Sequence, residues 1–170
     1  MATALPVPLE FRLPDGWTPA SPDDVGAPGV AFIALHPESR DERMANFTAN
    51  ITIAGKPYGP EITLTQLADD SVARLETAAL VQVADRTEAG TDDVPALSQV
   101  LRVTTQRDGE THQLMQCQVY LDLQDQADEA KRAVIELGLT ATANQIESLV
   151  GDFQSFVRTV APRQPEPGEQ

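Results

Sequence analysis

The sequence has 170 residues, with 26 acidic side chains against 12 lysines and arginines, and its formal net charge is −14 at pH 7. An acidic surface of this kind repels phosphate backbones, which argues against nucleic-acid binding. No apolar run approaches the roughly 20 residues that cross a bilayer, and a single cysteine, Cys117, excludes an internal disulfide framework. Hydrophobic residues make up 41% of the chain, so we expect one globular domain over residues 1–162.

The two ends of the sequence carry separate expectations. The first residues lack the basic start and the apolar stretch of a secretory signal, which predicts a cytoplasmic protein. A composition rich in Ala, Asp and Val suggests a bacterial source. Residues 161–170 contain three prolines and almost no apolar side chains, so residues 163–170 are predicted to be a disordered, acidic tail.

The first third of the chain predicts strands. Residues 8–13 form a short strand that ends at the turn sequence Pro14, Asp15 and Gly16, and residues 30–35 are apolar enough for a second strand. Residues 46–54 then alternate, as expected for a strand with one buried and one polar face. The apolar side is Phe47, Ala49, Ile51 and Ile53, and the polar side is Asn46, Thr48, Asn50 and Thr52.

A loop over residues 55–60 precedes the first predicted helix. Thr63 and Gln66 have the spacing of a capping box, in which each side chain bonds the backbone of the other residue. Apolar residues then recur at helical spacing to about residue 78. This stripe consists of Leu64, Leu67, Ala68, Val72, Leu75 and Ala79.

The next segment predicts an antiparallel meander. Strands over residues 80–84 and 97–106 flank a polar connection, and Asp108 with Gly109 predicts a hairpin turn. The returning strand alternates. One face carries Met115, Cys117, Val119, Leu121 and Leu123, and the other carries Leu114, Gln116, Gln118, Tyr120 and Asp122. After a loop at residues 124–129, a last strand has the inner face Ala133, Ile135, Leu137 and Leu139.

The chain closes with a second predicted helix. Thr142 and Gln145 repeat the capping-box spacing. The apolar stripe that follows is Ile146, Leu149, Val150, Phe153, Val157 and Val160. Gly151 interrupts this helix at a cost of roughly 1 kcal/mol relative to Ala, and we attribute its presence to close packing on the sheet.

These elements predict an α+β domain, a mainly antiparallel sheet of about six or seven strands packed by two long helices. Alternating strands imply one core face and one polar face. We infer that both helices cover the side of Phe47, Ile51, Cys117, Leu121 and Ile135. The open polar face would then carry Thr48, Asn50, Thr52, Gln116, Gln118 and Tyr120.

Few residues point to catalysis or metal binding. His36 and His112 lack the spacing of a metal site and are predicted to be solvated. Cys117, on an apolar strand face, is predicted to be a small buried hydrophobe with a raised pKa. Asp69 and Asp70 are neighbours on a helix and do not face each other, so they are predicted to be solvated. We therefore expect no metal, no cofactor and no enzymatic activity.

The order of elements resembles that of the PsbP-like superfamily, in particular its LpqN and DcrB branch. The likeness rests on the segment from Phe11 to Trp17 and on the end of the chain, where a strand, a small-residue turn and a helix with Phe153, Phe156 and Val157 follow one another. It covers roughly residues 8–160. The resemblance implies a PsbP-like α/β sandwich, mostly non-enzymatic members that bind a protein partner, and, near DcrB, chaperones for the membrane segments of secreted effectors.

The function predicted first is a non-catalytic protein-binding or accessory module that binds through the polar face of its sheet. Its acidity predicts a basic protein partner and salt-sensitive association, and a homodimer through the same face is a further possibility. We expect no nucleic acid and no membrane insertion.

Two alternatives stay open, and each requires its own site. A chaperone for a secreted effector needs an apolar groove, which Val30, Phe32, Val100, Leu114 and Val134 have the parity to line. A small-ligand or lipid carrier needs an enclosed pocket between helices and sheet. An enzyme would have to use His36, His112 or Tyr58.

Overall fold

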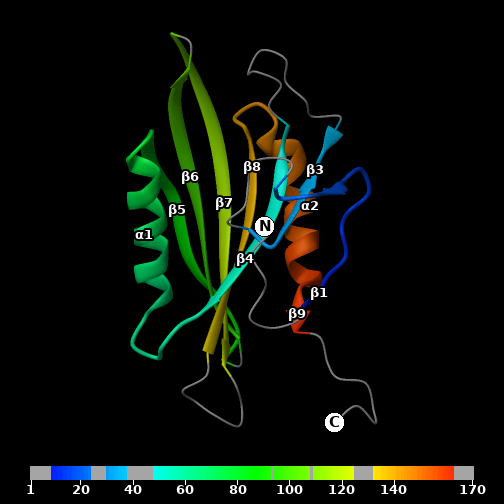
Figure 1. Cartoon of the computed structure of the whole chain (residues 1–170), viewed down its shortest axis with the longest axis vertical. Coiled ribbons are helices and arrows are strands. Elements are labelled where there is room, and N and C mark those ends of the chain that lie inside the picture. Colours follow the sequence, from blue (N-terminus) through cyan, green and yellow to red (C-terminus); the bar gives the residue numbers. More distant parts are fainter. Residues whose placement is uncertain are drawn as a thin grey trace.

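The computed structural model describes residues 9–23, 30–37, 48–92, 94–107, 109–124 and 132–162. Its main element is a seven-stranded sheet in which every neighbouring pair is antiparallel, as predicted. In spatial order the strands are β2 (Thr18–Ala20), β3 (Phe32–Leu35), β4 (Asn50–Pro57), β8 (Arg132–Thr142), β7 (Glu110–Gln124), β6 (Pro95–Arg107) and β5 (Leu80–Gly90) (Figure 1). The predicted tail at residues 163–170 and the loop at residues 124–129, apart from Gln124, lie outside the described residues.

A second, two-stranded sheet joins the beginning of the fold to its end. Strand β1 (Leu9–Glu10) pairs antiparallel with β9 (Ala161–Pro162). Beside it, the backbone N–H of Arg12 donates to the hydroxyl of Thr159 at 2.9 Å. The turn predicted after this segment is present, because the Trp17 N–H donates to the Pro14 carbonyl and Gly16 has a φ of 93°.

The two helices are of ordinary length. Helix α1 (Leu64–Glu76) has 13 residues and α2 (Ile146–Thr159) has 14, so the prediction of two long helices is not confirmed. Both bonds of the α1 capping box form, between Thr63 and Gln66. Thr142 and Gln145 also bond reciprocally, but they close a turn, and α2 begins only after it.

The helices lie on opposite faces of the sheet, and the prediction that both cover one face is wrong. Helix α2 packs on the apolar face of β4, β8 and neighbouring strands, whereas α1 packs over β5, β6 and β7 on the other face (Figure 1). Alternation alone suggested that the second face was too polar to be covered. Helix α1 covers it because its own contact surface includes Ala68 and Ser71, one a small residue that allows close approach and the other a hydrogen-bonding partner.

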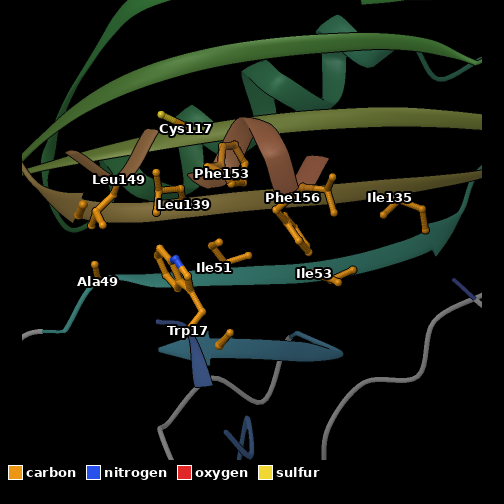
Figure 2. Packing of buried hydrophobic residues seen from close by; sticks show 13 residues of the cluster. Trp17, Ala49, Ile51, Ile53, Cys117, Ile135, Leu139, Leu149, Phe153 and Phe156 are labelled. Atoms are coloured by element: carbon orange, nitrogen blue, oxygen red, sulfur yellow. The ribbon is translucent and has the colours of Figure 1, made fainter. Parts of the chain in front are cut away.

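The larger core lies between α2 and the sheet. Side chains from β4, β8 and α2 point into one layer, as Figure 2 shows. The predicted apolar face of β8 and the described part of that of β4 are confirmed by this layer. Its buried members are Trp17, Ala34, Ala49, Ile51, Ile53, Cys117, Ile135, Leu137, Leu139, Ala141, Leu149, Phe153 and Phe156. Phe156 is fully buried, and its ring stacks edge-on against Phe11 at 5.6 Å.

Two strands are longer than predicted. Strand β4 continues through part of the expected loop to Pro57, since Lys56 and Pro57 pair with β8. Strand β5 continues through the expected polar connection to Gly90, with a register shift between Val83 and Asp85. In both places cross-strand pairing extends a strand through residues whose polarity predicted a loop.

Gly151 does not make the close packing expected of it. A Cβ atom at this position would have no neighbour within 4 Å, and the residue is exposed. Replacing Gly151 with Ala should therefore raise the free energy of unfolding by about 0.5–1 kcal/mol, because Ala loses less backbone entropy in a helix. Urea denaturation would measure the change, and an unchanged or lower stability would show that this glycine is needed.

The Phe156 side chain should account for a large share of the stability of the α2 core. Phe156→Ala removes a fully buried ring and leaves a cavity, with an expected loss of about 3–5 kcal/mol. The exposed neighbour Gln154 supplies the control, since Gln154→Ala should change the unfolding free energy by less than about 0.5 kcal/mol. Similar losses for the two variants would contradict this packing.

Candidate functional site

A continuous row of polar side chains crosses four strands on the α1 face of the sheet. Arg86 on β5 donates twice to Gln99 Oε1 on β6, at 3.0 and 2.8 Å. Gln99 Nε2 donates to Gln118 Oε1 on β7 at 2.7 Å. Gln118 Nε2 donates to Gln116 Oε1 at 2.6 Å, and Gln116 Nε2 donates to Thr140 Oγ1 on β8 at 3.0 Å. We call this row the polar ladder.

Helix α1 supplies further hydrogen-bond acceptors to the polar ladder. Gln118 Nε2 also donates to Ser71 Oγ at 3.0 Å, and Gln99 Nε2 also donates to the Ala68 carbonyl at 3.3 Å. Both N–H groups of each amide are therefore used. Asp69 accepts a bond from Arg86 at 2.7 Å at the edge of the helix. Buried amides are costly only when they lack partners, and here they hold α1 on the sheet.

Two of the six predicted partner-binding residues are consequently buried, and their prediction as exposed contact residues is wrong. Gln118 is 3% exposed and Tyr120 is 2% exposed, both beneath α1. Tyr120 packs with Leu67, Leu97 and Val134 in a second, smaller core. They are buried because the polar side chains of this face form hydrogen bonds with one another and with α1. With those bonds made, α1 can cover the face.

The other predicted residues, Thr48, Asn50, Thr52 and Gln116, are half-exposed. Asn50 pairs with Thr140 of β8, which in turn pairs with Gln116 of β7, so these three side chains share one row. Thr52 lies in the next row, opposite Gly138. The four half-exposed residues Asn50, Thr52, Gln116 and Thr140 form a surface beside α1 that we call the open polar strip.

A pocket of about 190 Å³ opens between α1 and strands β4, β7 and β8. Buried Leu67, Tyr120 and Val134 contribute its inner wall, and exposed Lys56, Asp70 and Arg74 contribute its rim. Its remaining lining is Ala54, Gly55, Tyr58 and Glu136. The pocket exists because α1 is centred over β5 and β6 and does not cover the sheet as far as β4.

Glu136 is the carboxylate inside this pocket. Burial raises the pKa of Glu136, an effect that the Arg74 guanidinium, the Tyr120 hydroxyl and the Lys56 ammonium oppose. The Tyr120 hydroxyl lies 3.3 Å from Glu136 Oε1 and 3.0 Å from Gln118 Oε1. Burial, followed by the charge of Glu136, raises the pKa of Tyr120, so this phenol stays neutral and joins the pocket to the polar ladder.

A buried ion pair fixes the segment that leads into α1. The Arg132 guanidinium donates to Asp122 at 2.7 and 2.9 Å. Its remaining terminal nitrogen donates to the backbone carbonyls of Gly59 and Ile62. The guanidinium thus ties the β4–α1 connection to β7 and β8 and fixes the edge of the pocket near Tyr58.

The other candidate residues are placed as follows. Cys117 is buried and burial raises the pKa of its thiol, as predicted. The histidines are less exposed than predicted. His36 packs against the Trp17 ring at 5.0 Å, and the His112 side chain is 14% exposed beside Glu110. Among the described residues, no three His, Cys, Asp or Glu side chains are grouped closely enough to hold a metal ion.

The residues proposed for an apolar groove do not share a face. Phe32 and Val100 pack against the α2 core, whereas Val134 belongs to the α1 core. Leu114 has the parity of Gln116 on β7. The chaperone groove predicted from these residues is therefore not formed by them. Nor is the pocket suited to a lipid chain, since four of its lining residues are aspartate, glutamate, lysine or arginine: Lys56, Asp70, Arg74 and Glu136.

Sequence reasoning missed most of the pocket. Of the residues considered for an enzyme, only Tyr58 lines it, and Asp70, predicted to be merely solvated, lies at its rim. Glu136 carried one signal, because it is a charged residue in the middle of an otherwise apolar strand. Its neighbours in the pocket come from three other elements and could be assembled only once α1 was placed.

The arrangement of sheet and helices defines the class of protein: the chain has a PsbP-like fold. No protein-family model matches the sequence, and no curated protein matches it. In the part of the chain that is described, no helix is long and apolar enough to cross a membrane.

Three solved structures illustrate the likeness. LpqN, involved in cell envelope biogenesis of Mycobacterium tuberculosis, matches with a TM-score of 0.64 at 15% identity, over 95% of this chain and 89% of that one. The cyanobacterial PsbP of Synechocystis matches with a TM-score of 0.59 at 14% identity, over 91% and 86%. The Ran-binding protein Mog1p of Saccharomyces cerevisiae matches with a TM-score of 0.54 at 10% identity, over 91% and 89%. At these identities the likeness is one of fold.

The polar ladder should be essential to the packing of α1. Gln118→Leu removes the acceptor of Gln99 Nε2 and the donors to Ser71 and Gln116, which leaves buried polar groups unpaired. The expected cost is about 1–3 kcal/mol in the free energy of unfolding. Exposed Gln82 on β5 gives the matched control, since Gln82→Leu should change stability by less than about 0.5 kcal/mol. A stable Gln118→Leu protein would show that the amide network contributes little.

Proposed function

We propose that this protein is a non-catalytic binding module that holds a basic protein partner along the open polar strip. The observation that carries the proposal is the strip itself. Asn50, Thr140 and Gln116 line up across three paired strands next to the pocket, and their side chains are half-exposed. A partner lying there would contact α1 and the sheet together.

The strip is a preformed surface. Gln116 and Thr140 are already held by the polar ladder, and Asn50 donates to the Thr48 carbonyl at 3.3 Å. Gly138 lies opposite Thr52 in the next row and leaves room for it, because a Cβ at Gly138 would lie 2.9 Å from Thr52 Oγ1. A surface that is ordered before binding loses less conformational entropy when a partner binds.

The net charge favours a basic partner. At −14, the field of the whole chain attracts cationic surfaces and accelerates their encounter. One protein of the same fold, Mog1p, is described as Ran-binding, which supports a binding role for this architecture without identifying the partner here. In the pocket, Tyr120 joins Glu136 to Gln118 of the polar ladder, an arrangement that suits a rigid scaffold.

Site-specific photocrosslinking would test this function. A photoreactive phenylalanine at Thr52 should capture a protein from lysate that the same group at Gln154, on the α2 side, does not capture. The captured protein is then purified and its affinity measured. Asn50→Arg/Thr52→Arg should weaken binding at least about tenfold by bulk and like charge, and raising the salt from about 0.1 M to about 1 M should weaken it further.

Gln154→Arg/Ser155→Arg on exposed positions of α2 is the matched control and should bind as the unaltered protein does. Circular dichroism should show that both double variants are folded. Equal losses in the two variants, or a loss only in the control, would place the binding surface elsewhere.

A further inference from the structure

The pocket beside the open polar strip has an unusual lining for so small a space. The chain contains two tyrosines, Tyr58 and Tyr120, and both line it. They share it with the carboxylates of Asp70 and Glu136. Aromatic rings attract cations through the negative potential of their faces, and carboxylates attract them by charge. Both features therefore favour a positively charged occupant.

Glu136 has room for a further partner. Among the described residues, its Oε1 atom has the Tyr120 hydroxyl at 3.3 Å, and no described side chain donates to its other oxygen. It is half-buried, and a carboxylate removed from water is stabilised when a cation is supplied to it. The cause of its raised pKa is burial, which agrees with an incompletely compensated charge.

Two cations at the rim oppose this attraction only in part. Lys56 and Arg74 are exposed, and neither forms an ion pair within 4 Å with any residue of the described ranges. Charges on flexible, exposed side chains are screened by water and salt and can move away from an entering cation. The backbone of Glu136, by contrast, is held in the central strand β8.

The shape of the pocket selects a cation on an aliphatic stem. Its volume of about 190 Å³ accommodates one side chain. The buried side chains of Leu67 and Val134 form an apolar part of the pocket wall that also includes Glu136. A lysine stem buries its methylenes against such a wall while its ammonium seeks a charged partner.

Resting on the proposed binding function, we propose that this pocket receives a lysine side chain of the basic partner bound along the open polar strip. Its stem packs against Leu67 and Val134, and its ammonium lies at Glu136, beside Tyr120. The lysine serves as the anchor, and the strip sets the direction of the partner chain. Asp70 adds a second carboxylate at the entrance.

The test uses n-butylammonium, which reproduces a lysine side chain, and butyrate, which has the same number of carbon atoms and the opposite charge. Each is titrated into the isotopically labelled full chain while amide NMR shifts are followed. Butylammonium should move the Gly55 and Glu136 amides with a Kd on the order of millimolar, and butyrate should not. Glu136→Gln should weaken butylammonium binding by about tenfold, whereas Glu147→Gln, the same change on exposed α2, should not.

Acid should weaken the interaction as well. The titratable groups that line the pocket around Glu136 are Lys56 on β4, Tyr58 between β4 and α1, Asp70 and Arg74 on α1, and Tyr120 on β7. Burial raises the pKa of Tyr120, so this phenol stays neutral, and Asp70 is exposed. Butylammonium affinity should therefore fall as the pH is lowered through the raised pKa of Glu136, and this loss should be much smaller in Glu136→Gln.

Preferential binding of butyrate, or no shift at Gly55 and Glu136 with either probe, would overturn the proposal. A third probe identifies the source of the amine. A capped peptide with one central lysine should bind at least as tightly as cadaverine, a free diamine. Cadaverine binding about tenfold tighter would overturn the assignment to a partner side chain and indicate a free amine as ligand. These measurements do not need the crosslinked partner, so a failure of the pocket to bind an ammonium group can be told apart from a failure of the strip to bind a partner.

Discussion

The rest of the structure depends on one constraint, that every buried amide of the polar ladder finds a partner. Gln99 and Gln118 are 1% and 3% exposed, and each uses both N–H groups of its side chain. With these bonds made, a polar sheet face accepts a helix. Without them, the same face would have to remain in water. The position of α1 follows from this hydrogen bonding together with the apolar contacts of Leu67 and Ala68.

The two helices lie on opposite faces of the sheet and also over different strands. This offset leaves the candidate site uncovered. Helix α2 is placed over β8 and its neighbours, whereas α1 is placed over β5, β6 and β7. Part of β4 and β8 is thus covered on one face and left half-exposed on the other. The open polar strip and the pocket both lie at this border. The Arg132–Asp122 pair fixes the connection at the pocket edge, so the border has a defined geometry.

The sequence was informative where a local rule decides the structure. The α1 capping box at Thr63 and Gln66, the turn at Gly109, and the alternation of β4 and β8 each depend on neighbours a few residues apart. The antiparallel sheet and its PsbP-like form followed from the order of these elements. The strand ends at Pro57 and Gly90 could not be predicted in this way, because pairing with a neighbouring strand overrides the local polarity there.

The side of the sheet that α1 covers could not be predicted, since a helix after a strand can return over either face. The face that α1 covers determines which residues form the candidate site. This placement of the helix buried Gln118 and Tyr120, predicted as contact residues, and it assembled the pocket from elements that carry no common motif. Asn50 and Thr52, both on β4, kept some exposure because α1 stops short of that strand, and Gln116 on β7 is also half-exposed.

The pairing of β1 with β9 has a consequence for how this domain would be attached to anything else. Leu9 lies opposite Pro162, and both belong to the end of the fold at the foot of α2 (Figure 1). A label, a surface or a second domain joined at either of these positions would be suspended from the same corner. The pocket lies under α1, on the other face of the sheet. An attachment at that corner would thus lie beside α2, and the pocket would lie on the opposite face of the sheet.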